Sequence, residues 1–132
     1  MIALDTSVII ALAFDEEDGR RISEIIARTP SLVGTPTLFE VGTVLTRMET
    51  AVADRFLAGF IARRSVRTVD FDLQMMELAR EAYRRYGKGS GHRAQLNFGD
   101  CFSYAIARFF GAPLLFKGND FAQTDLRSAW TL

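Results

Sequence analysis

Residues 2–12 have the sequence IALDTSVIIAL, an apolar triplet that ends at an acid and passes into a second apolar run. The triplet has the character of a short buried strand, with Asp5 at its end. Either Thr6 or Ser7 then caps a helix through residues 8–12, because hydroxyl oxygens accept hydrogen bonds from the free N–H groups of a first turn. A strand that leads straight into a helix is typical of α/β proteins. This stretch therefore sets the expected fold class.

The rest of the chain repeats this alternation of strand and helix. Short apolar runs predict further strands at residues 32–33, 66–69 and 114–116, and a short edge strand near residues 128–131. Apolar residues at helical spacing predict helices around residues 22–26, from Pro36 with Thr35 as its cap, and over residues 52–61, 76–86 and 97–110. Asn97 is expected to begin the last of these helices and Gly111 to end it. We therefore expect an α/β fold with a mostly parallel sheet and right-handed crossovers.

The composition is that of one ordinary domain, which we expect over residues 1–132. Apolar residues make up 48% and charged residues 24%, the proportions of a soluble globular protein. No apolar run approaches the roughly 20 residues that cross a bilayer, and the first residues lack a basic leader. The one cysteine, Cys101, has no partner for an internal disulfide, which favours a reducing compartment. We expect a cytoplasmic protein that does not bind membranes.

The distribution of charge says little about whether the protein binds nucleic acid. The formal net charge of +0 at pH 7 argues against a bulk electrostatic nucleic-acid binder. Fourteen of the 16 basic residues are arginines, whose planar guanidinium suits phosphate contacts. Several lie close together in the sequence: Arg63, Arg64 and Arg67, and then Arg84, Arg85, Lys88 and Arg93. Such runs are more often solvated helix faces than binding sites, so the charge leaves nucleic-acid binding open.

Four acids lie near predicted strand ends or helix starts: Asp5, Glu40, Asp100 and Asp120. In open α/β sheets, ligands bind beyond the carboxyl ends of the strands. Asp5 ends the first strand, and Asp120 lies in a Gly-Asn-Asp turn beyond a late one. Asp100 belongs to the first turn of a helix, and Glu40 lies at the edge of an apolar helix stripe, where it can face a cleft. Each also has a structural explanation: a helix cap for Asp5, the helix dipole for Asp100, a turn for Asp120 and a solvated surface for Glu40.

Taken together, the four acids indicate a metal site. Carboxylates gathered in one cleft repel one another, and some take up a proton unless a cation lies among them. Hard oxygen ligands suit Mg²⁺ or Mn²⁺, and such ions support in-line displacement at phosphoryl groups. The sequence has one histidine, His92 in a glycine-rich segment, and neither a phosphate-binding loop nor a Cys/His zinc pattern. We interpret His92 as a loop residue and Cys101 as a small core residue.

Four segments resemble the motifs of VapC-type PIN domains. DTSVIIA (5–11) is similar to the opening motif, and TLFEV (37–41) to the second, which carries a glutamate. YGKG (86–89) with LNFGDCFSYA (96–105) is very similar to the third, and LLFKGNDF (114–121), followed by TDL (124–126), to the fourth. The segments occur in family order over nearly the whole chain. The third segment is specific evidence for the family by itself, and the first segment alone is weak evidence. The four segments together are strong evidence for the resemblance.

The resemblance implies a three-layer α/β/α sandwich with endoribonuclease activity that depends on Mg²⁺ or Mn²⁺. By this resemblance, the catalytic and metal-binding residues would be Asp5, Glu40, Asp100 and Asp120. Thr6 or Ser7 would orient Asp5 or a water on the metal, and Asn97 would hold the start of the Asp100 helix. Asn119 differs from the family pattern, because many relatives carry another acid there.

The resemblance also implies partners. Members of the family cleave RNA, usually form homodimers, and are silenced by a small VapB-like antitoxin whose C-terminal segment crosses the active-site groove. The chain would then be the toxin of a type II toxin–antitoxin pair. Its RNA, its cleavage sequence and its choice between Mg²⁺ and Mn²⁺ stay open at this point.

Two other functions are alternatives. A phospho-receiver domain has a similar length and fold class, but it needs an acidic pair after the first strand, and Leu4-Asp5-Thr6 offers none. A PIN fold that has lost catalysis and serves as a binding module is the second alternative, and the four intact acids argue against it. One site residue has a competitor, because Asp125 also follows residues 114–116. We expect Asp120 to complete the set of four acids, since it is nearer the strand end, and Asp125 to be a structural acid.

Overall fold

The computed structural model of the chain describes residues 1–131. In these residues the strands are β1 (Ile2–Leu4), β2 (Ser31–Gly34), β3 (Val66–Val69) and β4 (Leu114–Leu115). The α-helices are α1 (Thr6–Ala13), α2 (Gly19–Arg28), α3 (Thr35–Thr46), α4 (Thr50–Ile61), α5 (Leu73–Tyr86) and α6 (Phe98–Phe110). Two 3-10 turns, η1 (Phe121–Gln123) and η2 (Ala129–Thr131), follow β4. Strands and helices thus alternate along the chain as predicted.

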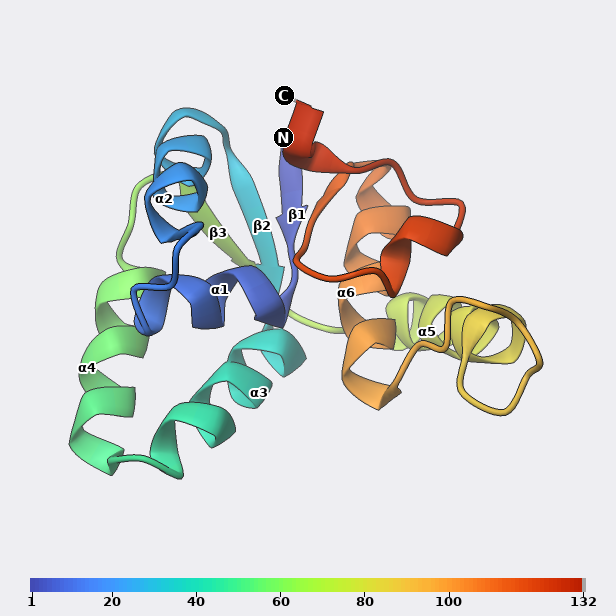
Figure 1. Cartoon of the computed structure of the whole chain (residues 1–132), viewed down its shortest axis with the longest axis horizontal. Coiled ribbons are helices and arrows are strands. Elements are labelled where there is room, and N and C mark those ends of the chain that lie inside the picture. Colours follow the sequence, from blue (N-terminus) through green and yellow to red (C-terminus); the bar gives the residue numbers. More distant parts are fainter. Residues whose placement is uncertain (132) are drawn as a thin grey trace.

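The strands form one parallel sheet in the order β3-β2-β1-β4. Ala3 in β1 pairs with Leu32 on one side and with Leu114 on the other. Because the strands are parallel, their carboxyl ends lie at one edge, where α1 and α3 begin (Figure 1). This edge is where an α/β sheet binds its ligands.

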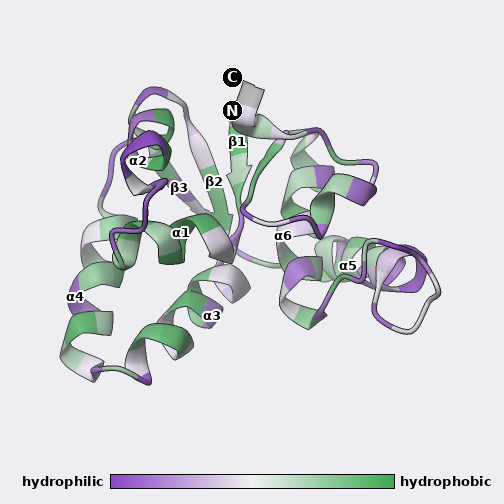
Figure 2. Cartoon of the chain, in the orientation of Figure 1, coloured by the Kyte–Doolittle hydropathy of each residue, from purple (hydrophilic) through white to green (hydrophobic). Residues whose placement is uncertain are grey.

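Both faces of the sheet are buried, which makes the protein three layers deep. Side chains of a strand alternate between faces, so Ile2 and Leu4 pack with residues of α1 to α4, whereas Ala3 packs with α5 and α6. Figure 1 shows α5 and α6 to the right of the sheet and α1, α2 and α4 to its left. The central strand β1 is accordingly green in Figure 2, whereas the edge strand β3 carries the polar residues Arg67 and Thr68. The predicted α/β/α sandwich is confirmed.

Several local predictions were wrong in detail. The side chain that caps α1 is that of Asp5, which accepts from Ser7 N, rather than that of Thr6 or Ser7. Gly34 precedes α3, which begins at Thr35, so Thr35 does not cap that helix with its side chain. The predicted edge strand near residues 128–131 is a single bridge between Ser128 and Leu114, followed by η2; residue 132 lies outside the described range. Within residues 1–131, no helix is long and apolar enough to span a membrane.

Candidate active site

Asp5 is a buried carboxylate with donors on both oxygens. Its side chain is held where β1 passes into α1, and the residue is only 4% exposed. One oxygen, Oδ2, accepts from Ser7 N at 3.1 Å and from Ser7 Oγ at 2.6 Å. The other, Oδ1, accepts from Ser103 Oγ of α6 at 2.6 Å. Ser7 Oγ in turn accepts from Lys117 N at 2.9 Å, just beyond β4. Asp5 therefore links the carboxyl ends of β1 and β4 to the middle of α6.

Glu40 comes to the same place from α3. Its carboxylate accepts a hydrogen bond from the Thr6 hydroxyl, the first residue of α1. The carboxylate also lies against Gly99 of α6, so closely that a Cβ at that position would stand 2.6 Å from Glu40 Cδ. The absence of a side chain at Gly99 is thus what lets Glu40 reach the acids from α3. Glu40 itself is half-buried, and its expected position beside a cleft stays a prediction.

Asp100 lies at the third position of α6, and its local structure is a capping box. Asn97 Oδ1 accepts from Asp100 N at 2.9 Å, and Asp100 Oδ2 accepts from Asn97 N at 3.0 Å. Such reciprocal bonds satisfy two N–H groups that a helix start leaves free. The helix begins after Asn97 as predicted. The structural explanation for Asp100 is therefore correct, and it does not exclude a second role for the outward part of the carboxylate.

The electrostatics of Asp100 connect all four acids. The pKa of Asp100 is raised from 3.8 to about 7: burial is the largest cause, the hydrogen bond from Asn97 opposes it, and the charges of Asp5, Asp120 and Glu40 add to it. Each of the other three predicted site residues is therefore near enough to repel a charge on Asp100. The three other acids, which come from distant parts of the chain, thus each act on Asp100 at the carboxyl edge of the sheet.

Asp120 is the exposed member of this group. It lies just before η1, in helical backbone conformation, and its side chain makes no capping bond there. Gly118, two residues earlier, has a φ of 91°, a left-handed conformation that favours glycine, and this turn brings the chain back over the edge after β4. Buried Phe121 packs its ring 5.3 Å from that of Phe116 and anchors the turn from below.

The donor set fits a hard divalent cation, although the acids are not gathered into a finished metal site. Among residues 1–131, no three His, Cys, Asp or Glu side chains converge closely enough to hold an ion as they stand. Both oxygens of Asp5, Glu40 Oε1 and Asp100 Oδ2 accept instead from the donors described above. The charges of Asp5, Asp120 and Glu40 add to the effect of burial in raising the pKa of Asp100, and carboxylate oxygens are the ligands that Mg²⁺ and Mn²⁺ prefer. A bound cation would reduce the repulsion between the carboxylates, which is otherwise reduced when Asp100 takes up a proton.

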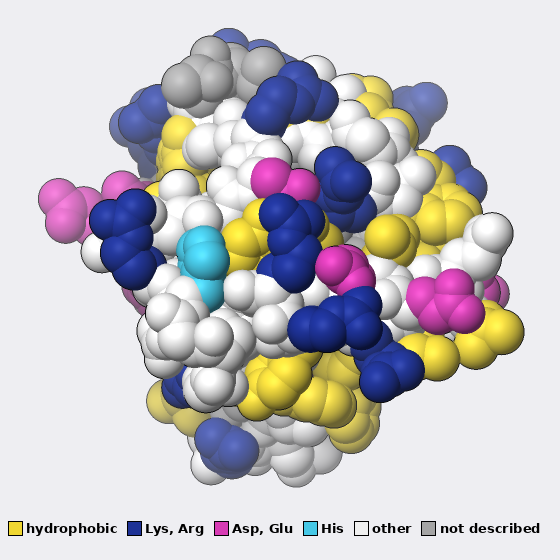
Figure 3. All heavy atoms as spheres, turned by 90° about the vertical axis from the view of Figure 1, so that its right-hand side faces the viewer, with side chains coloured by type: hydrophobic (Ala, Val, Ile, Leu, Met, Phe, Trp, Pro, Cys, Tyr) yellow, Lys and Arg dark blue, Asp and Glu magenta, His cyan; other side chains and the backbone are white. Residues whose placement is uncertain are grey.

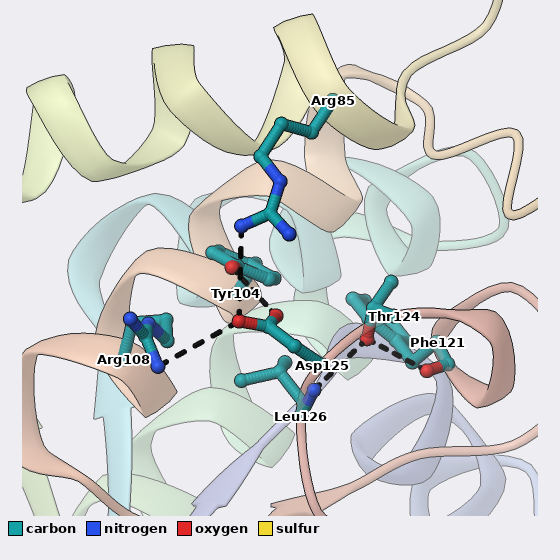
Figure 4. Close-up of polar contacts among 7 residues, drawn as sticks. All are labelled: Arg85, Tyr104, Arg108, Phe121, Thr124, Asp125 and Leu126. Carbon is teal, nitrogen blue, oxygen red and sulfur yellow. Dashed lines mark hydrogen bonds and ion pairs between the residues drawn. The ribbon is translucent and has the colours of Figure 1, made fainter. Parts of the chain in front are cut away.

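Asp125 occupies a different environment. Figure 4 shows it facing Tyr104, Arg85 and Arg108, on the side of α6 that packs against α5. Tyr104 OH donates to Asp125 Oδ1 at 2.8 Å, and Oδ2 lies 3.9 Å from Arg85 Nη1 and 3.7 Å from Arg108 Nη1. Next to it, Thr124 Oγ1 donates to Phe121 O at 2.7 Å. These contacts fasten the C-terminal segment to α5 and α6, which agrees with a structural acid.

Sequence reasoning missed two members of the site. Ser103 is buried at 1% exposure and donates to Asp5, but a serine in the middle of an amphipathic helix has no local mark of that role. Gly99 gave no signal either, because its importance comes from the packing of α3 against α6. A helical wheel that places Gly99, Asp100 and Ser103 on adjoining faces of α6 could have raised the question.

Two other residues lie beside the acids. Cys101 is buried and its Sγ is 3.4 Å from Asn97 O, and burial, with Asp100 next, raises the pKa of its thiol to about 11, so it is an inert core residue as expected. It lines a hollow of about 520 Å³ between α5 and α6, with apolar walls that include Phe98 and Phe102. His92 stacks edge-on against Tyr86, with ring centroids 4.8 Å apart, in the turn after α5. The hollow does not include the acids.

Comparisons with known proteins identify the family of the chain. The PIN domain family model matches residues 2–126. Ribonuclease VapC42 of Mycobacterium tuberculosis is 36% identical over 129 residues, which cover 97% of this chain and 98% of that protein. Ribonuclease VapC of Mycolicibacterium smegmatis is 41% identical over 126 residues, 95% of this chain and 97% of that protein.

Solved structures show the same fold. The crystal structure of Mycobacterium tuberculosis VapC20, a Sarcin-Ricin loop cleaving toxin, superposes with a TM-score of 0.76 at 22% identity, over 96% of both chains. VapBC2 from Rickettsia felis, bound to a DNA fragment from its promoter, gives a TM-score of 0.71 at 15% identity, over 97% of this chain and 96% of that one. The chain therefore belongs to the PIN-domain family and, within it, groups with the VapC proteins.

Proposed function

We propose that the chain is an endoribonuclease that cleaves RNA phosphodiester bonds with Mg²⁺ or Mn²⁺ and acts as the toxin of a type II toxin–antitoxin pair. The observation that carries this proposal is the electrostatic coupling of Asp100 to Asp5, Asp120 and Glu40 at the carboxyl edge of the sheet. Its relatives named VapC ribonuclease, at 36–41% identity, support the same activity.

The residues have distinct tasks in this proposal. Asp5 is preorganised, because the hydroxyls of Ser7 and Ser103 hold its two oxygens and leave little freedom of orientation. Glu40 is held by the Thr6 hydroxyl. Asp100 must release its proton to act as a ligand, which the pKa of about 7 permits near neutral pH. Asp120, exposed on its turn, completes the set from the solvent side.

A cation held by Asp5, Glu40, Asp100 and Asp120 supplies the positive charge that stabilises the phosphoryl oxygens during displacement. Without it, four carboxylates would repel the RNA backbone. The chain's own contribution is to hold these carboxylates at two helix starts, in the middle of α3 and on one anchored turn, where the surrounding packing limits their movement. One ion or two would fit this description.

The test is RNA cleavage by the purified chain in Mn²⁺, in Mg²⁺ and in excess chelator, with an Asp120→Asn protein prepared in parallel to detect contaminating nucleases. The proposal requires cleavage with the ions and none with chelator. A protein that is folded, binds RNA and never cuts it would support the inactive binding module instead.

We also propose an inhibitory partner, a small VapB-like antitoxin that presents an apolar helix and an arginine. Two phenylalanines flank the acids and are largely exposed: Phe39, next to Glu40, at 75%, and Phe98, next to Gly99, at 78%. An arginine from the partner could pair with the carboxylates through two parallel hydrogen bonds. A folded, active chain that leaves growth unchanged when expressed alone would count against the toxin function.

Two further parts of the proposal stay predictions. The homodimer that is usual in the family is testable by sedimentation of the purified chain. A cytoplasmic location agrees with Cys101, which has no partner cysteine.

A further inference from the structure

A second hollow, of about 480 Å³, lies at the opposite end of the sheet, where the parallel strands begin. Arg28, Arg64 and Arg67 line it, together with small residues between them. The lining residues, all within the described part of the chain, include no Asp or Glu. This hollow therefore differs in charge from the acid site at the other edge.

Three separate segments bring the arginines together. Arg28 ends α2, Arg64 lies in the turn before β3, and Arg67 is the second residue of β3. A backbone hydrogen bond of 2.7 Å from Ser31 N to Ser65 O joins the turn after Arg28 to the turn that contains Arg64. The fold thus adds Arg28, from a distant part of the chain, to Arg64 and Arg67 of the cluster noted in the sequence.

The guanidinium groups are available to an anion. All three residues are exposed. Within residues 1–131, only Arg28 has an ion pair among the three, at 3.5 Å from Glu24. The Arg67 guanidinium lies 5.7 Å from the centre of the Phe110 ring, a contact that orients it while its in-plane N–H donors stay free.

The other basic cluster of the sequence does not share these features. On α5, Arg84 pairs with Glu81, and Arg85 shares Asp125 with Arg108. Figure 3 shows basic and acidic side chains mixed on that face. Acids among these arginines weaken the attraction of that face for a polyanion, whereas the residues that line the hollow include three arginines and no acid, with one glutamate, Glu24, paired to Arg28.

The geometry relates the hollow to the acids through α6. This helix runs from Asp100 at the acid site to Phe110 beside Arg67. Ten residues of helix rise about 15 Å. A nucleic-acid strand in a helical conformation rises about 3.4 Å per nucleotide, so about four to five nucleotides span this distance.

We propose that this hollow binds phosphate groups of the RNA substrate, about four to five nucleotides from the cleaved bond. The proposal rests on the ribonuclease function proposed above and adds where a longer RNA is held. An open, exposed row of arginines from three segments suits a chain of phosphates that passes over it. It would make longer RNA bind more tightly than short RNA, independently of sequence.

The test compares an Arg64→Gln/Arg67→Gln protein with a matched control, Arg47→Gln/Arg55→Gln, in which two other exposed arginines are replaced. The probes are fluorescein-labelled oligouridylates of twelve and of three nucleotides, titrated in chelator over a range of salt concentrations. Loss of two phosphate contacts should reduce the slope of log Kd against log salt by about 1.4 and weaken binding of the longer probe about 25-fold at 0.1 M salt. The short probe carries too few phosphates to make the same set of contacts and should bind weakly to all three proteins.

Equal binding of the longer probe by the two double variants would overturn the proposal. So would a loss confined to the short probe and to inorganic phosphate, which would indicate a site for a small phosphorylated molecule. Because the titrations contain chelator, they need no cleavage. A wild-type chain that never cuts RNA with Mn²⁺ would refute the proposed function without altering the binding comparison.

Discussion

Gly99→Ala is the substitution that best separates the positioning of the acids from the stability of the fold. A Cβ at this position would stand 2.6 Å from Glu40 Cδ and closer still to Glu40 Oε2, whereas ordinary contact begins at 3.4 Å, so the Glu40 carboxylate must move by more than 0.8 Å. Its hydrogen bond from Thr6 would be disturbed as well. Displacement of a catalytic group by about 1 Å can reduce a rate by about 100-fold.

Stability should change far less than activity. Gly99 is not among the glycines with positive φ, so alanine fits the helical backbone, and it favours a helix interior by about 1 kcal/mol over glycine. The atom that must move is the end of a flexible side chain, and the weakened Thr6–Glu40 bond costs about as much as the helix gains. We expect the free energy of unfolding to stay within about 1 kcal/mol of the wild type, which corresponds to a Tm change of no more than about 5 °C.

Gly59→Ala in α4 is the matched control, because nothing lies within 4 Å of a Cβ added there. It should gain about 1 kcal/mol of stability and cut RNA at the wild-type rate. The assay is the initial rate of RNA cleavage with Mn²⁺, with thermal unfolding of the same samples. If Gly99→Ala cuts as fast as Gly59→Ala, the contact between Glu40 and α6 does not matter for catalysis and the reasoning is wrong.

Three other predictions concern the same site. In chelator, the free energy of unfolding should fall as the pH rises from about 4 to about 7 and then level off. The reason is that Asp100, with its raised pKa, keeps a proton in the folded chain that the unfolded chain has already released. Unfolding temperatures measured at both ends of this pH range check this, and Asp100→Asn should show the smaller change. Ser103→Ala removes a buried donor from Asp5 Oδ1 and should cost about 1–3 kcal/mol as well as activity; wild-type values of both would show that Ser103 does not position Asp5. Asp120→Asn should reduce the cleavage rate as severely as Asp5→Asn does, with the fold intact. Asp125→Asn should keep more activity but lose about 1 kcal/mol of folding stability, because Asp125 contacts Tyr104, Arg85 and Arg108. An inactive Asp125→Asn protein beside an Asp120→Asn protein of normal activity would reverse the assignment.

Local signals made α6 the most predictable element. Asn97 at its start and Gly111 at its end each have a backbone role that few residues fill: a side-chain acceptor for Asp100 N, and a φ of 61° at the helix end. Such signals need no knowledge of the rest of the fold. The start of α1 was harder, because Asp5, Thr6 and Ser7 are all good caps and the hydroxyls of the last two proved to have other partners.

Long-range contacts explain what the sequence could not reveal. Residues near 128–131 have the character of a strand, but Trp130 Nε1 donates to Phe116 O, and the chain curls into η2 after one bridge at Ser128. The acids were identifiable because of their residue types and their places near strand ends and helix starts. Their supports, Gly99 and Ser103, depend on how α6 packs against α3 and β1, and no local pattern encodes that packing.

The most direct test of a single metal site built from the four acids is to follow Mn²⁺ binding by electron paramagnetic resonance and RNA cleavage in one titration. For the wild type, binding and cleavage should rise together over the same Mn²⁺ range and vanish together in chelator. Asp5→Asn and Asp100→Asn, folded as judged by thermal unfolding, should lose both. Cleavage by the wild type that persists undiminished in excess chelator, or an Asp100→Asn protein that cuts RNA at the wild-type rate, would contradict the account.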